Sequence, residues 1–267
     1  MQNQDYLKAM QKKEYLKTGI TGLDQLLMKG IPKGAAILIE GGPGSGKTML
    51  ALQLACNFAK DGKKTLYMSF EEPETNLICH MIEDLGQNPK DLLSKDLLRV
   101  KRFSALDIAR SVEALLSEAK NELLIDVHPI LIPEDYNPEI VIFDSLTAIS
   151  SAFSGEKYRF RIYMEQLFRY LEKNNINSFL IRETSRPSHI GLPIAMADEA
   201  VSFLSDGIIV IYNVFHQIGQ RERAIEILKM RGADITQKIV KMEIIDKKGV
   251  FVHPNIQPTT KEKYTLT

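Results

Sequence analysis

The segment Gly41-Gly42-Pro43-Gly44-Ser45-Gly46-Lys47-Thr48 constrains the fold of this chain more than any other feature. It satisfies the pattern GxxxxGK[ST], in which glycines let backbone N–H groups crowd round phosphate oxygens. The apolar run Ile37-Leu38-Ile39 precedes it and a helical pattern opens near Thr48, so a helix N-terminus would face the phosphates. The sequence therefore predicts a nucleotide site in which Lys47 neutralises the terminal phosphates, built from Gly42, Pro43, Gly44, Ser45, Gly46, Lys47, Thr48 and Met49.

Short apolar, β-branched runs alternate with longer helical patterns along most of the chain. We expect strands over residues 35–40, 65–70, 97–103, 140–144, 178–181 and 208–212, and helices that include residues 48–59 and 160–171. This alternation predicts an α/β fold with a mainly parallel sheet flanked by helices. Near the end, the runs 224–230 and 239–245 follow one another without a helix, and Lys247-Lys248-Gly249 turns the chain into 250–252, so antiparallel C-terminal strands are expected.

A length of 267 residues, 44% of them hydrophobic, favours one large domain. Residues 1–17 are predicted to form a polar N-terminal arm, residues 18–256 the ordered domain, and residues 257–267 a tail. Residues 121–137 break helical periodicity just before the most apolar strand, which predicts a surface insertion.

Composition excludes several classes of protein. Lys and Arg total 34, as do Asp and Glu, so no overall basic excess favours nucleic acid or an anionic membrane. No apolar segment has the length of a membrane span or a signal peptide, and a cytoplasmic protein is expected. Neither the cysteines nor the histidines show metal-ligand spacing: Cys56, Cys79, His80, His128, His189, His216 and His253.

Two residues are candidate magnesium ligands. The Thr48 hydroxyl follows the phosphate-binding lysine, and Asp144 ends the apolar run 140–143. A carboxylate at the end of a buried strand needs a partner, which Mg²⁺ or its bound water would supply. The alternative interpretation is that Asp144 caps the next helix.

Glu71 and Glu72 are candidate catalytic residues. They follow the predicted strand 65–70, and ligands of open α/β sheets bind at the carboxyl ends of the strands. One of them can orient and deprotonate the attacking water, and Glu71 is the first choice. Alternatively, Glu72-Pro73-Glu74 only begins a helix, where acids and proline are favoured.

Taken in order, these motifs resemble the KaiC branch of the RecA superfamily over residues 18–254. The matching segments are Thr18-Gly19 to Asp24, Gly30-Ile31-Pro32-Lys33-Gly34, the phosphate loop, Phe70-Glu71-Glu72-Pro73 and Asp144-Ser145. The most specific match is Ser205-Asp206-Gly207, followed by Arg223–Leu228 and Lys229-Met230-Arg231-Gly232. The resemblance implies a RecA-like P-loop NTPase fold with ATP and Mg²⁺ as cofactors.

In KaiC-like proteins the corresponding Lys and Arg reach the γ-phosphate of the neighbouring subunit's ATP. The i, i+2 spacing of Lys229 and Arg231 on a strand places both on one face, with Met230 directed into packing. The resemblance therefore implies a head-to-tail homo-oligomer with shared ATP sites, expected to be a hexameric ring, and Asp246 near the neighbouring adenine. Alternatively, Lys229 and Arg231 are protective charges on a solvated edge strand.

This chain departs from the KaiC pattern in two places. It has Ala233 and Ile235 where the family commonly has Thr and His after Arg-Gly, which affects nucleotide selectivity and turnover. The threonine of the clock protein's phosphorylated pair is absent near Ser202-Phe203, so clock-type self-phosphorylation is not expected.

Three functions compete at this point. The first is a slow ring-forming ATPase whose nucleotide state is signalled to a protein partner, not identified by the sequence. The second is a RadA-like DNA-binding accessory that uses loops 150–158 and 186–191, which offer only a weak basic and aromatic footprint. The third is an ATP-sensing assembly module with little hydrolysis, against which Glu71 and Glu72 argue. Glu183 could sense the γ-phosphate or cap a helix.

Overall fold

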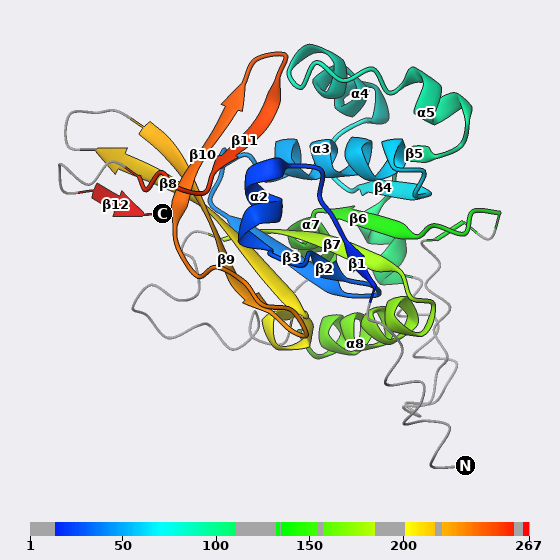
Figure 1. Cartoon of the computed structure of the whole chain (residues 1–267). Coiled ribbons are helices and arrows are strands. Elements are labelled where there is room, and N and C mark those ends of the chain that lie inside the picture. Colours follow the sequence, from blue (N-terminus) through cyan, green and yellow to red (C-terminus); the bar gives the residue numbers. More distant parts are fainter. Residues whose placement is uncertain are drawn as a thin grey trace, which may run out of the picture.

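The computed structural model describes residues 14–110, 132–133, 135–153, 157–184, 201–216, 221–258 and 264–266. Its centre is a ten-stranded sheet with the order β11-β10-β9-β8-β3-β7-β6-β4-β5, and β12 pairs with β8 (Figure 1). The strands from β8 to β5 run parallel: β3 (Ala36–Gly41), β4 (Thr65–Ser69), β5 (Leu98–Arg102), β6 (Ile140–Asp144), β7 (Asn177–Glu183) and β8 (Gly207–His216).

The C-terminal strands are antiparallel, as predicted. They are β9 (Arg221–Met230), β10 (Val240–Ile245), β11 (Gly249–His253) and β12 (Tyr264–Leu266). The α/β fold with a mainly parallel sheet, flanking helices and antiparallel C-terminal strands is therefore confirmed.

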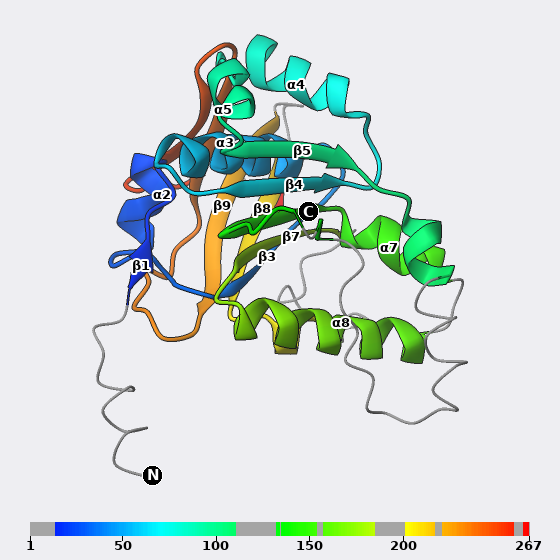
Figure 2. The same cartoon turned by 90° about the vertical axis from the view of Figure 1, so that its right-hand side faces the viewer.

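Helices cover both faces of the sheet (Figure 2). On one face lie α2 (Thr21–Leu26), α3 (Lys47–Lys60), α4 (Glu74–Glu83) and α5 (Lys90–Ser94). On the other lie α7 (Leu146–Ala152) and α8 (Lys157–Lys173). Successive side chains of β3 point to opposite faces of the sheet, so β3 contributes to the core on both sides. Ile37 and Ile39 pack with the core next to α3, whereas Leu38 packs with the core next to α8.

A buried ion pair interrupts the apolar core at the end of β3. Glu40 is fully buried and pairs with Arg182 of β7, which also donates a hydrogen bond to the Ser202 hydroxyl at 2.8 Å. Burying these charges is tolerated because each carries polar partners. The pair joins the central strands to the segment that precedes β8.

The ordered fold extends beyond the predicted boundaries. β1 (Tyr15–Leu16) falls within the predicted arm and pairs with β2 (Ile31–Pro32), because Leu16 packs against the core. β12 falls within the predicted tail. Most of the predicted insertion 121–137 lies outside the described residues, but Tyr136 is buried and its hydroxyl donates to the Thr65 carbonyl at 3.1 Å. None of the helices within the described ranges has the length and apolar character needed to cross a membrane.

Candidate nucleotide site

The phosphate loop connects β3 to the N-terminus of α3. Gly44 and Gly46 have φ angles of 65° and 102°, a region that favours glycine, and Gly46 is the N-cap residue of α3. A Cβ on Gly46 would lie 2.6 Å from the Ile244 Cδ1 atom. No side chain caps α3, so its first backbone N–H groups are directed at the loop, where they can bind an anion.

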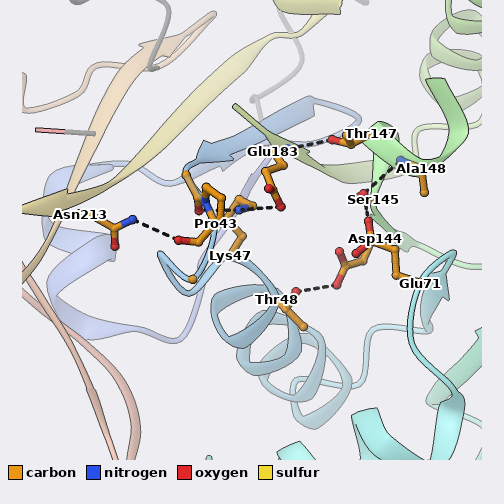
Figure 3. Close-up of polar contacts among 12 residues, drawn as sticks. Pro43, Lys47, Thr48, Glu71, Asp144, Ser145, Thr147, Ala148, Glu183 and Asn213 are labelled. Atoms are coloured by element: carbon orange, nitrogen blue, oxygen red, sulfur yellow. Dashed lines mark hydrogen bonds and ion pairs between the residues drawn. The ribbon is translucent and has the colours of Figure 1, made fainter. Parts of the chain in front are cut away.

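Lys47 lies in this loop as a nearly buried cation (Figure 3). Its Nζ donates to the Gly42 carbonyl at 2.8 Å and lies 4.0 Å from the Glu183 carboxylate. Burial lowers the pKa of Lys47, and the Glu183 and Asp144 carboxylates oppose that shift. Glu183, the last residue of β7, therefore lies in the nucleotide pocket.

Thr48 and Asp144, the predicted metal ligands, are in contact. Thr48 Oγ1 donates to Asp144 Oδ2 at 3.0 Å, and the Tyr67 hydroxyl donates to the same oxygen at 2.6 Å. Burial raises the pKa of Asp144, and the hydrogen bonds from Tyr67 and Thr48 partly offset that rise. Hard oxygen atoms on adjacent side chains are suited to Mg²⁺.

Asp144 is not the cap of the following helix. The N-cap of α7 is Ser145, whose Oγ accepts the Ala148 N–H at 3.3 Å. The same Ser145 hydroxyl donates to Glu71 Oε1 at 2.5 Å. Ser145 thus joins the α7 terminus to a predicted catalytic carboxylate, which leaves Asp144 directed into the pocket (Figure 3).

We expect Ser145→Ala to lower the free energy of unfolding by about 1 kcal/mol, because the Ala148 N–H loses its capping acceptor. Urea denaturation measures this change. Ser145→Thr is the matched control, since it keeps a hydroxyl and should unfold close to the wild-type midpoint. An alanine variant as stable as wild type would contradict the capping role.

Glu71 and Glu72 both line the pocket, beside Lys47, Thr48 and Asp144. The Ser69 hydroxyl fixes the backbone here, donating to the Glu72 carbonyl at 2.7 Å and accepting the Glu72 N–H at 3.0 Å. The segment also begins α4 at Glu74, with Pro73 as its N-cap. The segment therefore begins a helix and also lines the pocket, so it does more than start α4.

Strand β9 contributes arginines that sequence reasoning did not assign to the site. Arg221 and Arg223 approach the Gly44 carbonyl at 3.3 and 3.5 Å, and Arg221 is held by the Asn213 side chain at 2.6 Å. Asn213 in turn donates to the Pro43 carbonyl at 3.2 Å. The only signal in the sequence was the position of Arg223 within the matching C-terminal block.

Two buried polar atoms at the loop lack hydrogen-bond partners within the described part of the chain, Ser45 Oγ and Arg223 Nε. Burial and the nearby Arg221 lower the pKa of Arg223. Unsatisfied donors beside a lysine and a helix N-terminus are what a polyphosphate would satisfy. The residues present therefore fit a nucleotide with its Mg²⁺.

Lys229 and Arg231 lie at the other end of the sheet. Lys229 Nζ donates to the carbonyls of Ser205 at 2.6 Å and Ser202 at 3.2 Å, and Arg231 donates to the Phe203 carbonyl at 2.9 Å. Between them Met230 is buried and pairs with Gly207, which pairs with Ile37 at the start of β3. The phosphate loop follows the far end of β3, so neither basic residue contacts the loop of its own chain.

Asp246 lies in the exposed turn between β10 and β11. The next residue, Lys247, donates its backbone N–H to the Asp84 carbonyl at 2.9 Å, which places this turn against the end of α4 (Figure 1). Loop 186–191, predicted as a DNA contact, lies outside the described residues, as do His128 and His189. His80 is different, because it lines the nucleotide pocket.

Taken together, a glycine-rich loop between a parallel strand and a helix, with acids after two neighbouring strands, defines a P-loop nucleotide-binding site on a RecA-like sheet. The family model described as "ATPase: KaiC" matches residues 16–257. The chain belongs to this KaiC family of ATPases.

Individual relatives agree with this assignment. The UPF0273 protein PH0284 of Pyrococcus horikoshii is 27% identical over 90% of this chain and 94% of its own length. The circadian clock oscillator protein KaiC of Prochlorococcus marinus is 27% identical over 81% of this chain, which spans only 42% of that protein. The crystal structure of KaiC-like protein PH0186 from Pyrococcus horikoshii shares the fold, with a TM-score of 0.70, 22% identity, and coverage of 91% of this chain and 100% of that one.

Proposed function

We propose that this chain hydrolyses MgATP slowly at sites shared between subunits of a head-to-tail ring, and that a protein partner responds to the nucleotide state. The observation that carries the proposal is the separation of Lys229 and Arg231 from the phosphate loop of their own chain. Between Ile37 and Gly41 the strand alone spans about 13 Å, so the two basic side chains serve a different site or none.

Within one chain, the pocket supplies most of the required groups. The loop N–H groups and Lys47 would bind the phosphates, and Thr48 and Asp144 would hold Mg²⁺, which neutralises phosphate charge when bound. Glu71, which accepts a hydrogen bond from Ser145, would accept the proton of the attacking water, with Glu72 beside it. Arg223 adds a further cation for the phosphates. Met49 lines the same pocket.

The basic pair would act on the ATP of a neighbouring subunit. Main-chain carbonyls of residues 202–205 hold Lys229 and Arg231, and the Asp206 carboxylate lies 3.7 Å from Arg231. Arg231 remains half-exposed, so it can release these contacts for a phosphate. Stacking the Arg231 edge of one subunit on the phosphate-loop edge of the next would generate a heterologous contact, which forms a ring when the rotation between subunits closes. We further propose that the ring is a hexamer and that Asp246 lies near the adenine of the ATP bound by the neighbouring subunit.

The experiment combines ATP hydrolysis with light scattering on the purified chain, with and without Mg²⁺ and single-stranded DNA. We expect Mg²⁺-dependent hydrolysis without DNA in a ring-sized species. Strong stimulation by DNA would instead support the recombination accessory, and ATP binding without hydrolysis would support the assembly module. Full activity in a monomer would contradict the shared site.

A further inference from the structure

His80 lies between two carboxylates at the edge of the nucleotide pocket. Its Nε2 atom is 3.3 Å from Glu72 Oε2, and its Nδ1 atom is 2.6 Å from Asp84 Oδ2. His80 and Asp84 are one turn apart on α4, whereas Glu72 belongs to the segment that follows β4. The imidazole therefore connects the end of α4 to one of the two glutamates that face the phosphate loop.

The chemistry of imidazole restricts what this arrangement can be. A neutral imidazole has a single N–H, so one of its nitrogens would present a lone pair to a carboxylate. Only the imidazolium donates from both nitrogens. The hydrogen bond that His80 donates to Asp84 is the main reason that the pKa of His80 is raised above its ordinary 6.5, with a further contribution from Glu72 and an opposing one from burial.

The surroundings favour the same arrangement. His80 occupies the last turn of α4, where the helix dipole stabilises a cation and disfavours the Asp84 carboxylate that follows. Asp84 is also tied to the β10–β11 turn through the Lys247 N–H. The other charged residues of the elements round His80 are Lys47 and Lys60 of α3, Glu71, Asp144 and Glu183 of the pocket, Glu74 and Glu83 of α4, Arg99, Lys101 and Arg102 of β5, Arg223 of β9, and Asp246, Lys247 and Lys248 of the turn.

We propose that His80 is a positioning residue, which holds the Glu72 carboxylate at the nucleotide pocket while Asp84 fixes the orientation of the imidazole. The inference deepens the proposed ATPase function and rests on it, because the held carboxylate is one of the two beside the attacking water. In this proposal His80 is not a phosphate ligand. It acts on hydrolysis through Glu72.

The hold on Glu72 depends on pH. Below the raised pKa the imidazolium donates to both carboxylates, and as pH rises through that pKa the donor to Glu72 is lost. We expect kcat to fall by about fivefold across this step, roughly the effect of losing one half-exposed charge-assisted hydrogen bond, while KM for ATP changes little. The glutamine side chain in His80→Gln keeps an N–H donor but does not titrate. The kcat of this variant should therefore lie between the low-pH and high-pH values of wild type and should show no step with pH.

The test joins an NMR titration of the histidine imidazoles with kcat–pH profiles, using the full-length chain and MgATP. The His80 resonance is assigned by its loss in His80→Gln. We expect the His80 pKa to drop in Asp84→Asn and in Glu72→Gln, by about one unit for the closer partner. His253→Gln is the matched control, since His253 pairs with Glu243 at 2.8 Å on the β10–β11 hairpin, and its kcat–pH profile should match wild type.

The two arms separate this inference from the proposed function. If the pKa of His80 is the same in Glu72→Gln as in wild type, the inference is overturned, whether or not the chain hydrolyses ATP. If the pKa of His80 changes in Glu72→Gln but the protein hydrolyses no ATP, the interaction of His80 with Glu72 stands and the ATPase proposal is rejected. A responsive pKa with superimposable kcat–pH profiles for wild type and His80→Gln overturns the positioning role.

Discussion

The double variant Glu71→Gln/Glu72→Gln is expected to lose ATP turnover by on the order of 10³-fold, because it removes both candidate bases beside the phosphate loop. Glutamine keeps the size and hydrogen-bonding capacity of the side chains, so the pocket should still bind ATP. Phosphate release under saturating MgATP measures turnover, and calorimetric titration with ATP measures binding.

Glu83→Gln is the matched control for this experiment. Glu83 is an exposed carboxylate on α4 that does not line the pocket, so its removal should leave both measurements unchanged. Undiminished hydrolysis in the double variant would show that neither glutamate takes the proton. Lost binding would show that these side chains contribute to ATP affinity.

Arg231→Ala is expected to reduce kcat by on the order of 10³-fold, as loss of a trans-acting arginine does in related phosphoryl transfer. The variant should fold normally, because Arg231 is half-exposed and its contacts are to carbonyls and Asp206 at the surface. Single-turnover hydrolysis at saturating ATP measures the effect, and light scattering checks that the assembly persists.

Lys238→Ala serves as the control for Arg231→Ala, since it removes a partly exposed cation from the loop before β10. Its activity should equal that of wild type. If Arg231→Ala retained full activity in an intact ring, Arg231 would not act on the ATP of a neighbouring subunit, and the shared-site account would fail.

The sequence was sufficient for the features that are local in the chain. The strand and helix on either side of the phosphate loop follow from periodicity, as does the place of Asp144 at the end of β6. The burial of Met230 between two polar side chains follows from the two-residue repeat of a strand. Fold class and the core of the site could be predicted because each depends on a contiguous motif.

The missed residues act through contacts between distant segments. Tyr67 reads as an ordinary strand residue, and only the parallel pairing of β4 with β6 brings its hydroxyl to Asp144. His80 has no metal-ligand spacing, and its partner Glu72 precedes the helix. Arg223 was visible only as part of a matching block. β1 was missed because a two-residue strand has no measurable periodicity.

The most direct test of the shared site is to mix two inactive variants. Glu71→Gln/Glu72→Gln subunits retain Arg231, and Arg231→Ala subunits retain both glutamates. If subunits exchange at random in equal amounts, about a quarter of the interfaces combine an intact carboxylate pair with an intact arginine. The measurement is ATP hydrolysis as a function of the mixing ratio. We predict no activity in either variant alone and about a quarter of wild-type activity in the equal mixture. A mixture that stays inactive at every ratio, although light scattering shows intact rings and labelled subunits have exchanged, would contradict an ATP site built from two chains.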